Sequence, residues 1–379
     1  MAMSKHPSPV TIYAVAEAAG VSIATVSRVL SRPDVVAAHT RARVRSAIAD
    51  LDYVPAGSAR SLAVRQNEAH GLVLPELSGP YYSELLTGYE AAAADAGQSV
   101  VLMLAFGKTD LVRAVRNLAA KVDGIAVLGS IGLPGPVLAG LVRSTPVMVI
   151  AGDPADGIEA VNAENRSSTM ALTRHLMDHG RSKLLFLGDP QSAPDVRDRY
   201  AGFVDAYAAD ARVGGRRSRA SDRAPAPIAM AFVESEGARI ADEIATGRLD
   251  ADALVCANDE VALAVIHRLK QLGLRVPADV AVVGFDDLMA ARYVEPGLTT
   301  VRQPVRELGS LIATRLHDRI GGAPARSAPT VLPTELVIRQ SCGCPAPDIR
   351  QPADAASAPL ADPNRRTRPI TVQHEGVTP

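Results

Sequence analysis

Two short helices joined by a single glycine are predicted in the segment Thr11–Leu30, TIYAVAEAAGVSIATVSRVL. Apolar residues in its first half recur at the i, i+3, i+4 and i+7 spacing of one helix face, and Thr11 stands ahead of them as an N-cap. Gly20 supplies the backbone freedom for a sharp turn, and Ser22 can cap the second helix. This pattern predicts a helix-turn-helix, although spacing alone leaves an ordinary helical hairpin open.

The second predicted helix has an apolar inner side and a mixed outer side. Its inner residues are Val26, Val29 and Leu30. Its outer residues are Ile23, Ala24, Thr25, Ser27 and Arg28. A short helix with such an exposed side is suited to the major groove of double-stranded DNA.

The segment VAEAAGVSIATVSRVL resembles, nearly position by position, the DNA-binding head of the lactose-repressor-type (LacI/GalR) family of bacterial transcription regulators. The resemblance implies an all-α head followed by a two-lobed α/β core similar to a periplasmic sugar-binding protein, over about residues 65–342. It also implies a regulator, most simply a repressor, that binds a near-palindromic operator and responds to a small-molecule effector.

The DNA contacts are expected from the start of the second helix, at Ser22, Ile23, Ala24, Thr25, Ser27 and Arg28. Ile23 and Ala24 are apolar, so they can touch thymine methyl groups but cannot hydrogen-bond to bases. Arg28 can donate to a guanine or to phosphate, whereas Thr25 and Ser27 suit phosphate oxygens. The family usually caps the third helix with Ser, where this chain has Ala37.

Residues 56–66 resemble the hinge helix of the family. By that resemblance Leu62 is a wedge that opens a base step from the minor groove, with Ala59 alongside it. The alternative is that Leu62 packs against the core. Ala56 stands where the family usually has Asn, and Gly57 is a poor helix former, so the hinge is expected to be weakly helical by itself.

Charge separates the head from the rest of the chain. Residues 1–66 hold eight Lys or Arg and four acidic residues, whereas the remainder carries a net charge of −5. A basic end on an acidic body fits contact with DNA through that end only. No apolar run of membrane-spanning length and no signal-peptide core occur, so we expect a cytoplasmic, nucleoid-associated protein without a membrane partner.

From about Gly71 short β-rich runs alternate with helical patterns, which predicts parallel sheets with helices on both faces. The repeating units are too many for one sheet, so two doubly wound lobes are expected, with a ligand beyond the strand ends. The chain is expected to comprise a disordered N-terminus at 1–10, a helix-turn-helix domain at 11–55, a hinge at 56–66, a core at 67–344 and a disordered tail at 345–379. Within the core, the first lobe is expected at about 67–161 plus 302–321, and the second at about 162–301 plus 322–344.

Among the strands predicted in the second lobe are Leu184–Leu187 and Ala229–Val233. The segment Arg212–Pro227 between them is read as a solvated loop, with extra DNA or partner contact as its alternative.

Seven residues are expected to line the effector site, because they match cleft positions of the family. They follow predicted strands or lie near the start of predicted helices. They are Tyr81, Tyr82, Asp153, Arg199, Phe232, Asn258 and Asp286. Carboxylates and amides bridge vicinal hydroxyls while rings cover C–H faces, so this set suits a sugar or sugar derivative. A purine- or nucleoside-type corepressor is the alternative, because rings also stack on bases.

A homodimer is expected, since one head offers too little surface for tight binding. A tetramer is the less favoured alternative, because the tail lacks the sustained leucine heptads of a coiled coil. An enzyme is not expected, because no Gly-rich dinucleotide fingerprint, P-loop or nucleophile elbow occurs, and no cofactor is implied. No metal site is expected either, since the two thiols of Cys342 and Cys344 are too few for a closed site. A small-molecule-binding protein of the cytosol without operator activity stays open as an alternative.

Overall fold

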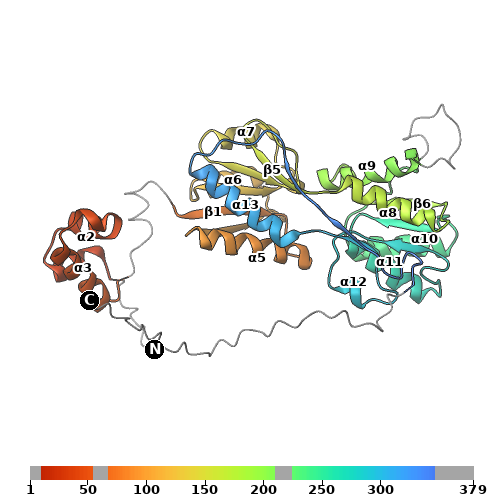
Figure 1. The fold of residues 1–379 in the computed structure, drawn as a ribbon, viewed down its shortest axis with the longest axis horizontal. Helices are drawn as coiled ribbons and strands as arrows, with labels where there is room; N and C mark the ends of the chain where they lie inside the picture. Colours follow the sequence, from red (N-terminus) through yellow and green to blue (C-terminus); the bar gives the residue numbers. More distant parts are fainter. Residues whose placement is uncertain (1–9, 54–66, 210–223, 346–379) are drawn as a thin grey trace, which may run out of the picture. The chain divides into compact units, whose positions relative to one another are not determined.

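The computed structural model describes residues 10–53, 67–209 and 224–345, and its elements are labelled in Figure 1. The predicted N-terminal segment up to residue 9, the whole hinge at 56–66, much of the loop at 212–227 and the tail from 346 lie outside the described residues. Ala59 and Leu62 are therefore not described.

The described part of the head is built from α-helices and one 3-10 turn. They are α1 (Ile12–Ala19), α2 (Ile23–Ser31), η1 (Pro33–Val35) and α3 (Ala38–Asp50). The chain bends by 102° between α1 and α2, and Gly20 makes this turn with a φ of +60°. Apolar side chains from all three helices form a small core, which comprises Val15, Ala16, Ala19, Val26, Val29, Val44, Ala47 and Tyr53.

The first lobe contains a six-stranded sheet in the order β10-β5-β4-β3-β1-β2, with every paired strand parallel. Its strands are β1 (Ala69–Leu74), β2 (Ser99–Leu104), β3 (Gly124–Leu128), β4 (Val147–Ile150), β5 (Glu159–Ala163) and β10 (Thr330–Leu332). Its helices are α5 (Gly79–Asp95), α6 (Leu111–Ala119), η2 (Gly129–Ile131), α7 (Gly135–Val142) and α13 (Val305–Ile320).

Alternate strand residues of this sheet serve two apolar cores. Leu72 and Leu74 pack with Leu85 and Tyr89 of α5 and with α13, whereas Val73 packs with α6 and α7 on the other side. Figure 1 shows α5 and α13 running beside one another. Both faces of the sheet are thereby covered, as expected for a parallel sheet.

The second lobe contains a parallel three-stranded sheet in the order β6-β7-β8. Its strands are β6 (Leu184–Leu187), β7 (Ala253–Cys256) and β8 (Ala281–Val283). β9 (Thr300–Arg302) and β11 (Glu335–Val337) form an antiparallel pair, and a single bridge joins Thr299, just before β9, to Val283 of β8. Its helices are α8 (Arg166–Asp178), α9 (Pro194–Ala209), α10 (Glu234–Ala245), α11 (Asp259–Gln271) and α12 (Ala290–Tyr293). Again two apolar cores flank the sheet, one with α8 and α9 and one with α10 and α11.

Two features of the second lobe differ from the prediction. The strand predicted at Ala229–Val233 is wrong: only Ile228 forms a bridge, to Leu187, because prolines precede it and α10 begins at Glu234. The segment 322–344 was assigned to the second lobe, whereas Thr330–Leu332 pairs with β5 in the first-lobe sheet. The chain therefore passes between the lobes three times, after β5, after β9 and after β10.

Among the residues that the structure describes, no single helix has the length and apolar character to cross a membrane. The pair α1 and α2 passes that test only when the two are joined, and the chain is sharply bent between them.

Candidate functional site

The outer side of α2 carries the six residues predicted to contact DNA within the helix-turn-helix. Ser22 accepts a hydrogen bond from the backbone N–H of Thr25 at 3.2 Å, so the N-cap predicted there is confirmed. Thr11 occupies the N-cap position of α1 as predicted, but its side chain makes no cap hydrogen bond. Ile23, Ala24 and Arg28 are exposed. Thr25 and Ser27 are half-buried, and the buried Val26 and Val29 hold this side of the helix outward.

Two arginines of α3 fix the turns on either side of α2. Arg43 donates to the carbonyls of Ala19 and Gly20, at the turn that precedes α2. Arg41 donates to the carbonyl of Pro33 at 3.0 Å, at the turn that follows it. Through these backbone contacts the two guanidiniums hold the outer side of α2 in place. The sequence pattern did not reveal this role.

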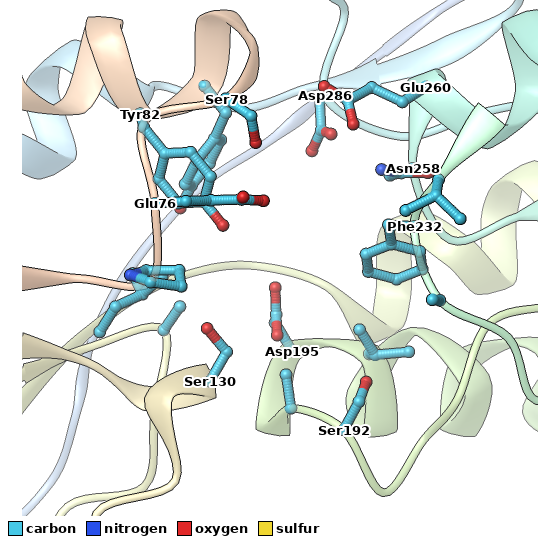
Figure 2. Close-up of a pocket in the computed structure, with 18 of the residues that line it drawn as sticks. Glu76, Ser78, Tyr82, Ser130, Ser192, Asp195, Phe232, Asn258, Glu260 and Asp286 are labelled. Carbon is cyan, nitrogen blue, oxygen red and sulfur yellow. The ribbon is translucent and has the colours of Figure 1, made fainter. Parts of the chain in front are cut away.

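A cavity of about 410 Å³ opens at the carboxyl ends of the strands of both lobes (Figure 2). The first lobe contributes residues that follow β1, β3 and β4, together with the start of α5. The second lobe contributes residues from the start of α9, from 230–233 and from the ends of β7, β8 and β9. Its lining residues are Pro75, Glu76, Ser78, Tyr81, Tyr82, Leu128, Ser130, Ala151, Ser192, Ala193, Asp195, Val196, Arg199, Met230, Ala231, Phe232, Val233, Asn258, Glu260, Asp286, Leu288 and Gln303.

Six of the seven predicted effector residues line this cavity, namely Tyr81, Tyr82, Arg199, Phe232, Asn258 and Asp286. Asp153 does not line it: its carboxylate accepts hydrogen bonds of 2.8 and 2.9 Å from Arg197 instead. This pair is exposed, and its hydrogen bonds lower the pKa of Asp153. Asp153 thus occupies the end of β4 as predicted but turns to an arginine on α9.

Arg199 is the buried cation of the site. Its guanidinium donates to the side-chain oxygen of Asn165 at 2.8 Å and to the carbonyl of Ala257 at 2.6 Å. It also donates to Asp195 at 3.3 Å and lies 3.8 Å from the ring centroid of Phe285. Because Arg199 is only 4% exposed, these contacts fix its orientation before any ligand arrives.

Carboxylates outnumber cations on the cavity wall, where Glu76, Asp195, Glu260 and Asp286 surround the single guanidinium of Arg199. Burial raises the pKa of Glu260, and the nearby Glu76 adds to the increase. Burial also raises the pKa of Asp286 to about 7, against the opposing effects of Arg199 and of a hydrogen bond from Gln303. The site is therefore suited to neutral or cationic groups and unfavourable to phosphate or carboxylate ligands.

Aromatic rings face one another across the gap. Tyr81 and Tyr82 form an edge-to-face pair with centroids 5.4 Å apart at the start of α5. Figure 2 shows Tyr82 and Glu76 on one side and Phe232 and Asn258 on the other. Burial raises the pKa of both tyrosine hydroxyls, which consequently stay protonated and can donate hydrogen bonds.

Several polar lining residues were not predicted. Glu76 and Gln303 follow β1 and β9, so the rule that ligands bind beyond strand ends offered a signal for them. Asp195 and Glu260 stand in the first turns of α9 and α11, where an acidic residue ordinarily indicates favourable interaction with the helix dipole. Their position on the cavity wall follows from the packing of the two lobes, which the sequence does not show.

Comparison with known proteins identifies both parts of the chain. Residues 11–56 match the family described as bacterial regulatory proteins, lacI family, and residues 173–342 match the periplasmic binding protein-like domain. The transcriptional regulator GalR of Salmonella typhimurium strain LT2 is 30% identical over 341 residues, which cover 88% of this chain and 96% of GalR.

The chain belongs to the LacI family. Among solved structures, the Lac repressor dimer bound to operator and the anti-inducer ONPF is similar, with 27% identity, a TM-score of 0.74 and coverage of 88% and 99% of the two chains. A complex of the regulator CelR with cellobiose has 28% identity, a TM-score of 0.63 and the same coverage. The predicted family and fold class are confirmed, and this LacI-family chain is a transcriptional regulator rather than an enzyme.

Proposed function

We propose that this protein is a repressor that binds a near-palindromic operator as a homodimer and is controlled by a small molecule held between its lobes. One observation carries the proposal: a chain that exposes the start of α2 on its head also forms a cavity lined by both lobes of its core. A cavity of this kind couples ligand binding to the relative position of two lobes. A repressor of this kind acts on chromosomal DNA.

The operator contacts proposed here are those of α2 together with the hinge. Ile23 and Ala24 are assigned to thymine methyls, Arg28 to a guanine or phosphate, and Ser22, Thr25 and Ser27 to the backbone. Ala59 and Leu62 are assigned to the minor groove, although both lie outside the described residues. The operator in the Lac repressor complex supports this assignment by family likeness.

The proposed effector is a neutral or amine-bearing sugar. Four carboxylates, the amides of Asn258 and Gln303 and the side-chain hydroxyls of Ser78 and Ser130 can bridge vicinal hydroxyl groups, while Phe232 covers a C–H face. The excess of carboxylates disfavours sugar phosphates, because a buried anion would meet like charges. The cellobiose bound to CelR supports this class of ligand.

The control mechanism proposed is a population shift between two lobe arrangements. A ligand that contacts both walls favours the arrangement in which they are closer, and the paired hinges of the dimer then change their spacing. A difference in affinity of a few kcal/mol between the two arrangements is enough to change operator occupancy. The proposal holds for an inducer and for a corepressor alike.

A homodimer is proposed because large apolar side chains are exposed on both lobes. Phe106, which follows the edge strand β2, is 83% exposed, and Met289 and Tyr293 of the α12 region are 70% and 80% exposed. Apolar side chains of this size at a surface indicate a contact region. The Lac repressor, which is similar over 99% of its chain, is a dimer in its operator complex.

The test combines a gel shift with a ligand screen. The purified full chain is mixed with the DNA upstream of its own gene and with random competitor at physiological salt, and thermal shifts are recorded with neutral sugars, amino sugars, sugar phosphates and nucleosides. We expect selective retardation of the upstream fragment and a rise in melting temperature with a sugar that also changes the retardation. A shift with a nucleoside alone would favour the purine-type alternative, and equal binding to random DNA would contradict operator recognition.

A further inference from the structure

Four side chains of metal-binding type converge at the end of α8 and the segment that follows β11. They are His175, His179, Cys342 and Cys344, and one potential ligand atom from each lies within 4.8 Å of all the others. The sulfur of Cys342 is 3.3 Å from Nε2 of His175, and the sulfur of Cys344 is 3.5 Å and 3.3 Å from Nε2 of His175 and His179. The cluster lies in the second lobe, and none of its members lines the effector cavity.

These separations match the edges of a small coordination tetrahedron. With a Zn–S bond of about 2.3 Å and a Zn–N bond of about 2.0 Å, tetrahedral angles place a sulfur and a nitrogen about 3.5 Å apart. Three of the four sulfur–nitrogen distances in the cluster are 3.3, 3.5 and 3.3 Å, and every pair of ligand atoms lies within 4.8 Å. The four ligand atoms can therefore surround one ion without a large movement of the backbone.

Local structure explains why the ligands point together. His175 and His179 are four residues apart at the end of α8, so their rings lie on one face, with centroids 4.6 Å apart. Gly343 has a φ of +112°, a conformation that other residues rarely adopt, and it connects the two cysteines that reach the same point. The sequence showed only the two thiols, because the imidazoles lie more than 160 residues away.

We propose that these four residues form a structural zinc site. Two thiolates and two imidazoles in a tetrahedral arrangement are a ligand set typical of Zn²⁺, whereas Mg²⁺ and Ca²⁺ prefer oxygen ligands. All four positions are filled by the protein, so no position is left open for a substrate and the ion stabilises the fold. On binding, each thiol that ligates Zn²⁺ loses its proton to solvent and forms a metal–sulfur bond, with no change of oxidation state.

A hydrogen bond from outside the ligand set supports the site. The hydroxyl of the buried Thr299 donates to the sulfur of Cys342 at 3.2 Å, and the same hydroxyl accepts from the backbone N–H of Arg339 at 2.8 Å. This arrangement supplies a donor to a sulfur that becomes negatively charged when it binds the ion. Partners of this kind orient metal ligands in known sites.

The proposed ion joins two segments that enter the second lobe separately. α8 begins just after the first passage between the lobes, and residues 339–344 follow the third. A metal bond between them closes a loop of more than 160 residues, so it should restrict the unfolded chain as well as the native one. Removal of the ion is expected to loosen the end of α8 more than the effector cavity.

The experiment uses the full chain, purified under reducing conditions, and measures zinc by elemental analysis. We expect about one zinc per chain in the parent protein and less than about a tenth of that in Cys344→Ser and in His179→Gln, because each variant removes one of the four ligands. His267→Gln is the matched control, since it changes an exposed histidine of another helix in the same lobe. Circular dichroism checks that each variant is folded.

Two further measurements test the metal site in the parent protein itself, so the result does not depend on whether every variant folds. Cobalt loaded into the parent protein should show the intense visible bands of a tetrahedral ion and a thiolate charge-transfer band. A chelator should lower the melting temperature of the parent and of the control but not of the ligand variants. A reduced parent that binds neither metal, zinc content in His179→Gln equal to that of the control, or a disulfide between the two cysteines in place of the ion would each overturn the proposal.

Discussion

Adjacent aspartates in the second lobe show how strongly position controls charge. Asp286 faces the cavity, where burial raises its pKa to about 7. Burial would also raise the pKa of Asp287, but hydrogen bonds from Arg339 and Arg302 outweigh it and lower that pKa. Near neutral pH the carboxyl of Asp286 is thus available to a ligand as a hydrogen-bond donor or acceptor. The carboxylate of Asp287 stays ionised and is held by its arginine partners.

The first prediction concerns Asp286→Asn. In the unfolded chain this carboxyl titrates near 3.8, so below that pH it is protonated in both states. The folded chain retains the proton up to about pH 7, and the stability contributed by the neutral form is lost as the pH rises through that value. Between pH 4 and 8 the free energy of unfolding of the parent should fall relative to the variant, by up to about 4 kcal/mol.

Urea denaturation at several pH values measures this difference. The titratable groups that interact with Asp286 include Arg199 and Asp195 of α9 and Asp259 and Glu260 of α11, and the substitution leaves them in place. Parallel stability profiles for parent and variant would show that Asp286 titrates normally.

The second prediction contrasts two arginines on α9. Arg199→Met removes a buried guanidinium and leaves Asp195, Asn165 and a carbonyl without their donor, so the free energy of unfolding should fall by about 3–5 kcal/mol. Arg197→Met breaks an exposed pair with Asp153 and should cost less than about 1 kcal/mol. Chemical denaturation of both variants checks this, and equal losses would contradict the assigned roles.

Sequence reasoning placed six of its seven effector residues at the cavity, in part because strands in parallel sheets end at a common edge. Tyr81, Asn258 and Asp286 all follow such strands. The same rule failed for Asp153, because the position of a residue in the chain does not determine which way its side chain turns. It also could not reveal the two histidines of the proposed zinc site, since only the packing of α8 brings His175 to Cys342.

At the scale of elements, α3 lacks a side-chain cap. Ala37 occupies the N-cap position, with a non-helical φ of −54° and ψ of 140°, but no side chain there accepts a backbone hydrogen bond. Ala37→Ser should stabilise the head by about 1 kcal/mol, because its hydroxyl can accept from an N–H of the first turn. Ala42→Ser, at an exposed position within α3, should instead destabilise it by about 0.5 kcal/mol.

Hydrogen exchange of the α3 amides in the full chain measures both effects. Protection should increase in Ala37→Ser and decrease in Ala42→Ser. The same direction of change in both variants would mean that the serine acts through something other than the cap.

The elements that the sequence predicted best are continuous apolar strands. The bounds of β6 agree with the strand predicted at Leu184–Leu187, since a short apolar run bounded by non-apolar residues defines it. α8 was missed because its buried face carries Ser168, Thr169 and Thr173, whose hydroxyls bond to other polar groups rather than forming an apolar stripe. β9, β10 and β11 have three residues each, which is too short for a periodic signal.

At the scale of the whole molecule, the two edges of the six-stranded sheet differ in what they expose. Beside β2, Phe106 is 83% exposed, whereas β10 at the opposite edge presents the smaller Val331, which is 50% exposed. A dimer that buries the β2 edge would cover the larger apolar surface and remove an open strand edge from solvent.

The last prediction follows from that asymmetry. Phe106→Ser should weaken self-association in sedimentation velocity, because it removes the largest apolar group at the proposed contact, while Val331→Ser should leave the dimer unchanged. Operator affinity should fall together with dimerisation in Phe106→Ser, since a near-palindromic site requires two heads at a fixed spacing. If Val331→Ser dissociated the dimer instead, the contact would lie at the β10 edge; if neither variant changed association, the interface would be formed by other surfaces, such as α12.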